Sequence, residues 1–145
     1  MKKWDKRFMR MAKEVSKWSK DPSTQTGCIL VSPDRTRTVI GYNGFPAMMP
    51  DLDHLYRQKE EKYSRIIHAE MNTLLNSPGS VRGWTAYCYP LFPCDRCAVH
   101  LIQAGIARVV SIPLETQHNH WKDALARSVA YFEQSGVEVC IERMK

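Results

Sequence analysis

Two short clusters of metal-binding residue types, far apart in the chain, most restrict how it can fold. His68 and Glu70 stand two positions apart, and Cys94 and Cys97 form a Cys-x-x-Cys pair directly after Pro93. Residues two apart face away from each other on a helix body, so His68 and Glu70 reach one point only at a helix N-terminus. Cysteines three apart share one side of a first helical turn, where the helix dipole stabilises thiolates. The fold must therefore bring two helix starts together.

The residue types in these clusters predict a zinc site of the catalytic kind. Three nitrogen or sulfur ligands from the protein, with water in the fourth position, are typical of such sites. We expect His68, Cys94 and Cys97 to bind Zn²⁺ and Glu70, which is not needed as a ligand, to carry protons. Zinc lowers the pKa of bound water from about 15.7 to about 7, so a hydroxide nucleophile forms near neutral pH.

The Cys-x-x-Cys pair is also compatible with a redox pair or a structural zinc knuckle. A redox pair leaves the His-Ala-Glu cluster without a role. A structural zinc knuckle needs a fourth ligand with the spacing of a second Cys-x-x-Cys or a zinc-finger His pair, which the chain lacks. The residues that could supply that ligand are Cys28, Cys88, Cys140, His54, His100, His118 and His120. The three cysteines among them lie in apolar runs, and we expect them to be core thiols.

Length and composition favour one soluble domain. The chain has 145 residues, 43% of them hydrophobic and 25% charged, which is ordinary for a single globular core over residues 1–145. No apolar run is long enough to cross a bilayer, and the first residues do not resemble a secretory signal. Five cysteines, two of them in a metal-like pair, fit a reducing compartment. We therefore expect a cytoplasmic protein without a membrane partner.

The net charge of +6 includes a basic cluster near the N-terminus. Its members are Lys2, Lys3, Lys6, Arg7, Arg10 and Lys13. A basic surface attracts nucleic acid or a small phosphorylated substrate. A solvated helix face accounts for the same residues, and we favour that interpretation.

Periodicity predicts helices that alternate with strands. Trp4, Phe8, Met11, Val15 and Trp18 form an apolar stripe of a first helix, which we expect to end at Asp21-Pro22. Two strands at 28–32 and 38–42 form a hairpin, and a loop with a short helix near 52–61 follows. Further helices are expected at 68–75, 94–103 and 121–134, with strands at 85–89, 107–112 and 137–141. We expect a three-layer α/β/α fold with a mixed sheet of about five strands.

Longer blocks around the clusters make the chain resemble the zinc-dependent cytidine and deoxycytidylate deaminase superfamily, and its deoxycytidylate deaminases in particular. These blocks are Asp21-Pro22-Ser23-Thr24-Gln25-Thr26-Gly27-Cys28, Gly41-Tyr42-Asn43-Gly44-Phe45-Pro46, His68-Ala69-Glu70-Met71-Asn72, and Phe92-Pro93-Cys94-Asp95-Arg96-Cys97 with Gln103-Ala104-Gly105-Ile106. They follow the order of the family and cover most of residues 4–112. The His-x-Glu and Pro-Cys-x-x-Cys signature is itself typical of zinc deaminases that act on nucleobases.

The resemblance implies a fold like that of cytidine deaminase and a hydrolase that converts dCMP to dUMP. Zinc-bound hydroxide would attack C4 of the base, with Glu70 as proton shuttle. Asn43 would contact the sugar or base, the Ala69 N–H would hold the base carbonyl, and Ser23, Thr24 and Gln25 would line the nucleotide pocket. The family also implies a homo-hexamer, and in many members dCTP and dTTP act as effectors, with Mg²⁺ accompanying the triphosphate.

Two rival functions remain to be distinguished from dCMP deamination. One is deamination of another cytosine nucleotide, such as dCTP or 5-substituted dCMP, or of a base in nucleic acid. The basic charge favours a nucleic acid substrate, but the sequence contains no appended basic arm or series of stacking aromatics, so we do not expect this partner. The other rival is a zinc-stabilised binding module without catalysis, in which Glu70 has no essential role.

Overall fold

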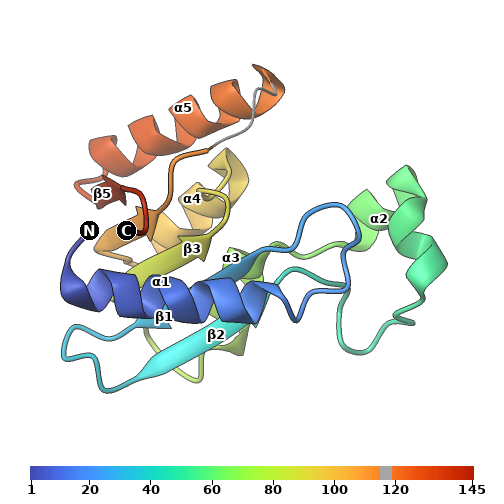
Figure 1. The fold of residues 1–145 in the computed structure, drawn as a ribbon, viewed down its shortest axis with the longest axis horizontal. Coiled ribbons are helices and arrows are strands. Elements are labelled where there is room, and N and C mark those ends of the chain that lie inside the picture. The colour runs from blue at the N-terminus through green and yellow to red at the C-terminus, as the bar shows by residue number, and fades with distance from the viewer. Residues whose placement is uncertain (115–118) are drawn as a thin grey trace.

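A computed structural model describes residues 1–114 and 119–145 of the chain, apart from the side chains of residues 119 and 120. The described residues form a five-stranded mixed sheet with the strand order β2-β1-β3-β4-β5 (Figure 1). The strands are β1 (Gly27–Val31), β2 (Thr38–Tyr42), β3 (Thr85–Tyr89), β4 (Arg108–Ser111) and β5 (Glu138–Ile141). β1 pairs antiparallel with both β2 and β3, whereas β3, β4 and β5 are parallel. The predicted hairpin and the parallel crossovers are both confirmed.

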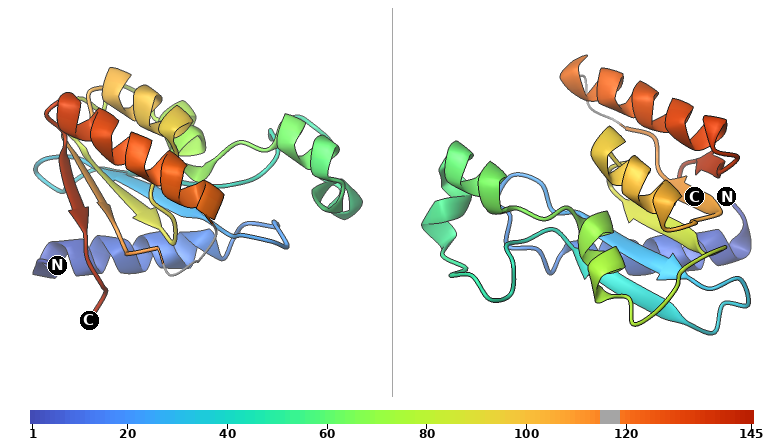
Figure 2. Two further views of the ribbon diagram at one scale, coloured as in Figure 1. Left: turned by 90° about the horizontal axis from the view of Figure 1, so that it is seen from above. Right: turned by 180° about the vertical axis from the view of Figure 1, so that it is seen from behind.

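Helices cover both faces of this sheet, which confirms the three-layer prediction (Figure 2). Helix α1 (Lys3–Ser16) lies on one face, and α3 (Ala69–Asn76), α4 (Asp95–Gln103) and α5 (Asn119–Gln134) lie on the other. The segment between β2 and α3 extends away from the sheet and contains the 3-10 helix η1 (Asp53–Arg57) and α2 (Lys59–Arg65). None of the helices in the described part of the chain is long and apolar enough to span a membrane.

Two apolar layers fix the helices on the sheet. Strand β1 is buried on both sides, and its residues alternate between the layers. Cys28 and Leu30 join the layer under α3, α4 and α5, whereas Ile29 and Val31 join the layer under α1. Fully buried Phe132 anchors α5 in the first layer. A central strand that is apolar on both faces is what a covered sheet requires.

The buried face of α1 differs from the predicted stripe. Phe8 and Val15 are buried as expected, but the other members of the stripe, Trp4, Met11 and Trp18, are 42%, 40% and 51% exposed. Met9 and Ala12 take their place against the sheet. Both the predicted stripe and the observed buried residues recur every three or four positions, so the periodicity alone does not choose between them. The small Ala12 side chain lets α1 approach β1 closely. The helix also ends at Ser16, five residues before the predicted stop, in a turn where Trp18 N donates to Val15 O.

Candidate metal centre and active site

The start of α3 positions His68 and Glu70. His68 is the N-cap and has an extended backbone (φ −66°, ψ 153°), so its side chain leaves the chain before the helical turn begins. Glu70 lies within the first turn and is only 7% exposed. The preceding residue, Ile67, exchanges two backbone hydrogen bonds with Gly44, which fix the entry into the helix. Both residues therefore lie at the helix N-terminus, where their side chains need not diverge as they would on a helix body.

The start of α4 positions the two cysteines in a comparable way. Cys94 is the N-cap, and its sulfur accepts a hydrogen bond from the backbone N–H of Cys97 at 3.4 Å. The buried Ser128 hydroxyl on α5 donates to the Pro93 carbonyl at 2.7 Å, so α5 holds the turn that leads into the helix. A sulfur at a helix N-terminus faces unpaired N–H groups that favour negative charge.

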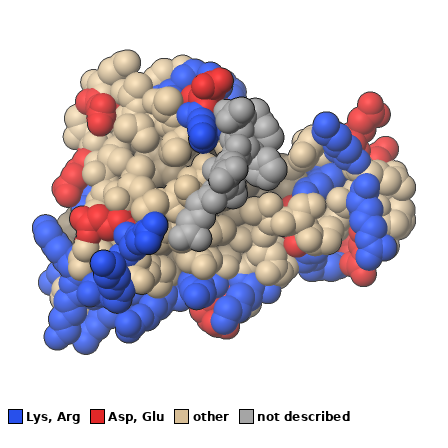
Figure 3. All heavy atoms as spheres, turned by 45° about the horizontal axis from the view of Figure 1, so that its top comes forward, with Lys and Arg blue, Asp and Glu red and all other residues tan. Residues whose placement is uncertain are grey.

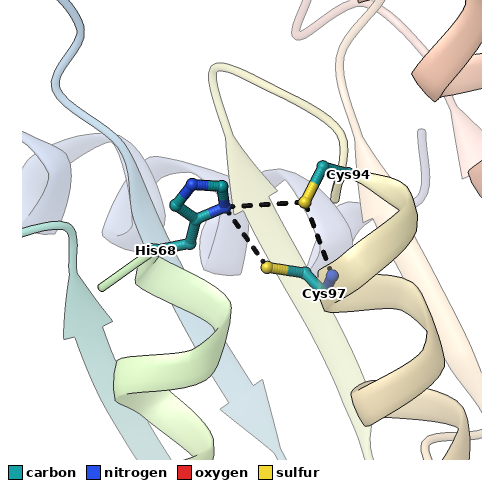
Figure 4. Close-up of side chains that lie close together, drawn as sticks. All are labelled: His68, Cys94 and Cys97. Carbon is teal, nitrogen blue, oxygen red and sulfur yellow. Dashed lines mark hydrogen bonds between the residues drawn. The ribbon is translucent and has the colours of Figure 1, made fainter. Parts of the chain in front are cut away.

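His68, Cys94 and Cys97 meet in one cluster (Figure 4). His68 Nδ1 lies 3.5 Å from Cys94 Sγ and 3.4 Å from Cys97 Sγ, and all three ligand atoms lie within 4.8 Å of one another. In a tetrahedral site with Zn–N of about 2.0–2.1 Å and Zn–S of about 2.3 Å, nitrogen and sulfur ligands stand roughly 3.5 Å apart. The spacing and the donor types therefore fit a zinc ion.

The cluster shifts the protonation of its own members. Hydrogen bonds from the Cys97 thiol and from His68 lower the pKa of Cys94 to about 4, although burial opposes them. The hydrogen bond with Cys94 raises the pKa of His68. Burial raises the pKa of Glu70, because its carboxylate is removed from water. A thiolate ligand and a carboxyl group that accepts protons readily thus lie side by side.

A fourth protein ligand is absent from this cluster within the described residues. Cys28 and Cys88 face each other across β1 and β3, with their sulfurs 3.8 Å apart, as buried core thiols. Cys140, in β5, is only partly buried and lies 3.5 Å from a Glu142 oxygen, so its predicted core position is only partly correct. His100 Nδ1 bonds the Arg96 carbonyl on α4. His118 and the side chain of His120 lie outside the described residues.

Of the residues predicted to contact a nucleotide, Ala69 is the first residue of α3, and the other four lie in two neighbouring loops. Asn43 is buried, and its amide is engaged within the protein: Oδ1 accepts from Thr26 N at 2.9 Å, and Nδ2 donates to Thr24 O at 2.9 Å. Ser23, Thr24 and Gln25 are exposed, and Gln25 Nε2 donates to Ser19 O at 2.6 Å. Asn43 thus fixes the shape of the loop that presents these exposed side chains.

Three residues that support the site were not predicted from the sequence. Asp21 Oδ1 accepts hydrogen bonds from Ser23 N at 2.8 Å and from Lys62 Nζ at 2.8 Å. The Asp-Pro-Ser pattern is typical of such a turn and could have pointed to Asp21, but no local signal marks Lys62. Gly41 on β2 lets α3 approach, because a Cβ there would lie 2.4 Å from Thr73 Oγ1 and 2.6 Å from Thr73 N.

A mixed sheet with a three-ligand metal site at two helix starts defines the zinc-dependent deaminase class. Residues 2–112 match the family described as the cytidine and deoxycytidylate deaminase zinc-binding region, and the chain belongs to this family. An uncharacterized deaminase encoded in the luxG 3′ region of Aliivibrio fischeri is 38% identical over 142 residues, 94% of this chain and 92% of that protein. Human deoxycytidylate deaminase is 34% identical over 140 residues, 92% of this chain and 76% of its own.

A solved structure has the same fold. It is the dCMP deaminase from the cyanophage S-TIM5, crystallised in complex with dCMP and dUMP. The two chains superpose with a TM-score of 0.72 and are 26% identical, and the match covers 97% of this chain and 98% of the phage chain. The sheet and the helices on both of its faces are thus those of a dCMP deaminase.

Proposed function

We propose that this protein hydrolyses dCMP to dUMP and ammonia in deoxynucleotide metabolism. The observation that carries the proposal is the triangle of His68 Nδ1, Cys94 Sγ and Cys97 Sγ beside the buried Glu70 carboxyl group. The human relative and the phage structure, both dCMP deaminases, support this choice of substrate. The test is ammonia release together with the fall in cytosine absorbance when zinc-loaded protein is given dCMP.

Under this proposal His68, Cys94 and Cys97 hold the zinc ion. When bound with three protein ligands, zinc acidifies a water molecule in its open position and thereby supplies a nucleophile near neutral pH. The hydrogen bond from Cys97 N to Cys94 Sγ keeps the Cys94 thiolate in place. The hydrogen bond from Ser128 to Pro93 keeps the start of α4 in place.

Glu70 is the proton carrier of the proposed reaction. Its carboxylate takes a proton from the attacking water and delivers it to N3 of the cytosine ring as the new C4–O bond forms. A second proton passes from the added hydroxyl group to the exocyclic nitrogen, and ammonia leaves as the C4–N bond breaks. Burial raises the pKa of Glu70, which suits a group that must be protonated and deprotonated in each turnover.

The nucleotide would bind between the start of α3 and the loop at residues 21–26. The backbone N–H of Ala69 belongs to the first turn of α3, where N–H groups have no intrahelical partner, and we assign it to the base carbonyl. Ser23, Thr24 and Gln25 would line the pocket, because their side chains are exposed on that loop. Asn43, whose amide already bonds this loop, would shape the pocket and present the one remaining lone pair of Oδ1 to the sugar.

We further propose, on the family resemblance, that residues 1–145 form a single catalytic domain. This domain assembles as a homo-hexamer in the cytoplasm. Its activity responds to dCTP and dTTP in the presence of Mg²⁺. The two apolar layers on one shared sheet support a single domain. Light scattering of the zinc-loaded protein, with and without each triphosphate, tests the assembly. Initial rates with dCMP, measured with dCTP or dTTP in the presence of Mg²⁺, test the regulation.

The alternative is another cytosine substrate, namely dCTP, 5-substituted dCMP or a base in nucleic acid. The basic side chains near α1 are the observation that favours nucleic acid. A panel of dCMP, dCTP, deoxycytidine, 5-methyl-dCMP and a cytosine-containing single strand separates these substrates. We expect the highest kcat/KM on dCMP, and a steep salt dependence only if the strand is the substrate.

A further inference from the structure

A basic groove lies on the α1 side of the molecule, away from the helices that carry the zinc ligands. Figure 3 shows Lys and Arg side chains gathered at the end of the molecule where α1 begins. Lys6, Arg10 and Lys13 follow one flank of α1 at helical spacing and form one wall of the groove. Arg143, in the segment that follows β5, lines the opposite wall. The basic cluster near the N-terminus thus contributes to a concave site as well as to a solvated helix face.

The groove is formed by the fold itself. Helix α1 packs mainly on β1 and β3, so the surface beside it over β4 is left to the segment after β5. Glu142 N donates to Ser111 O, and Met144 packs into the α1-side apolar layer, which together hold that segment on the sheet. The α1 wall is held by the buried Asp5 carboxylate, which binds Arg108 through both of its oxygens. Both walls are therefore anchored independently of any ligand.

The size and lining of the groove suit a small anionic ligand. Its volume is about 450 Å³, within the usual range for small-molecule sites. Among the described residues, the lining contains no Asp or Glu side chain. Its remaining members are Lys145, Tyr89, Ile112, Pro113 and Met144. Lys13 Nζ lies 5.8 Å from the centre of the Tyr89 ring, so this cation lies over an aromatic side chain that also lines the groove.

The charges of the groove are not balanced by carboxylates of the described residues. Among the described residues, nine ion pairs form, and none of them joins a carboxylate to Lys6, Arg10, Lys13 or Arg143. Like charges that face one another across a concave surface repel, and a ligand with several negative charges relieves this repulsion. The groove gathers five cationic side chains around one volume, so the charge of a chain of phosphates matches it better than that of a single phosphate.

We infer that this groove binds a chain of consecutive phosphoryl groups, either as a free oligophosphate or as a nucleic acid backbone. The groove adjoins the active-site side at Ile112, which also lines a small apolar pocket that contains Cys94. A ligand in the groove would therefore lie next to the loop at residues 112–114 without entering the zinc cluster. This function is separate from the deamination of a nucleotide that carries one phosphate.

Calorimetric titration of the zinc-loaded protein with inorganic tripolyphosphate tests the inference. We expect one tripolyphosphate per chain, with binding that survives saturating dCMP. The triple substitution Lys6→Gln, Arg10→Gln and Lys13→Gln should weaken binding about tenfold or more, and Arg143→Gln alone about threefold. The matched control, Lys59→Gln with Arg82→Gln and Lys122→Gln, removes the same charge from other surfaces and should change binding less than about twofold.

A second titration, with a short single-stranded oligothymidylate, distinguishes the two sources of the phosphates. Tighter binding of the oligonucleotide, lost in the same groove variants, would identify a nucleic acid backbone, and the reverse order would identify a free oligophosphate. The inference is overturned if neither probe binds, if dCMP displaces the probe, or if the control variant loses as much affinity as the groove variant. It is also overturned if orthophosphate competes as well as tripolyphosphate at equal ionic strength. Because Arg143 lies outside α1, its variant keeps the test informative should the triple variant misfold.

Discussion

Lys62 Nζ lies 2.8 Å from Asp21 Oδ1, and this ion pair joins α2 to the loop that carries the exposed Ser23, Thr24 and Gln25. Asp21 is buried and Lys62 is partly buried, with side-chain exposures of 3% and 12%. The same aspartate accepts from Ser23 N and, through its other oxygen, from Asn43 Nδ2 at 3.2 Å. The segment between β2 and α3 is thereby tied to the loop assigned to the nucleotide.

Replacing Lys62 by methionine should loosen that loop more than it destabilises the protein. We expect the free energy of unfolding to fall by about 1–3 kcal/mol, because a largely buried carboxylate loses its counterion. We also expect KM for dCMP to rise more than kcat falls, since the zinc cluster is untouched. Lys62→Arg, which keeps the charge, should restore most of the affinity. An unchanged KM in the methionine variant would show that the loop does not contact the substrate.

Substitution of Gly41 tests how closely α3 must approach the sheet. In Gly41→Ala the new methyl group would meet both the backbone nitrogen and the hydroxyl of Thr73, so α3 must shift. We expect a loss of about 1–3 kcal/mol in the free energy of unfolding and weaker zinc binding, because His68 caps the same helix. Gly79→Ala is the matched control, since a Cβ there meets nothing within 4 Å. Equal effects in both variants would contradict this account.

The Asp5 carboxylate should make the stability of the protein depend on acid pH. Burial raises the pKa of Asp5, but hydrogen bonds from Arg108 and Tyr87 outweigh it, so the pKa is lowered overall. A lowered folded-state pKa stabilises the protein fully above the unfolded value of about 3.9. That stabilisation is lost as the pH falls through the folded-state pKa. Between about pH 6 and pH 3, the wild type should therefore lose more unfolding free energy than Asp5→Asn, measured by denaturant titration.

The zinc ligands can be tested by metal content without any assay of activity. Cys94→Ser should lower bound zinc well below one ion per chain after dialysis, because a serine hydroxyl is a poor ligand beside Cys97 and His68. It should also lower the melting temperature of the zinc-loaded protein, since metal that binds only the folded state stabilises it. Cys140→Ser is the control, and its zinc content should match that of the wild type. Full zinc occupancy in Cys94→Ser would refute the ligand assignment.

The cluster and the sheet could be predicted from sequence because their signals are local. The spacings of His68 with Glu70 and of Cys94 with Cys97 each specify a helix start, and the alternation of strands and helices specifies crossovers. The two starts meet because the hairpin and the crossovers of one sheet place α3 and α4 side by side. The superfamily blocks then pointed to the loop at residues 21–26 and the turn at Asn43.

The features of the fold and site that the sequence did not predict depend on contacts between distant segments of the chain. Nothing near Lys62 in the sequence indicates that it pairs with Asp21, because the pairing depends on where α2 lies. The apolar spacing of α1 admits two faces, and only packing against β1 selects Ala12 over Met11. The basic residues of α1 were interpreted as a solvated face because Arg143 lies far along the chain. Its position across the groove follows from the parallel pairing of β5 with β4.

The central claim, that Glu70 carries the protons of a zinc-dependent dCMP deaminase, is tested most directly by Glu70→Gln. The measurement pairs zinc content with the rate of dUMP formation from saturating dCMP. We expect about one zinc ion per chain, as in the wild type, and a fall in kcat of roughly 10²–10⁴-fold or more, because glutamine cannot accept the proton. A variant that keeps both its zinc and its rate of dUMP formation would contradict the account and would leave a zinc-containing fold in which Glu70 has no catalytic role.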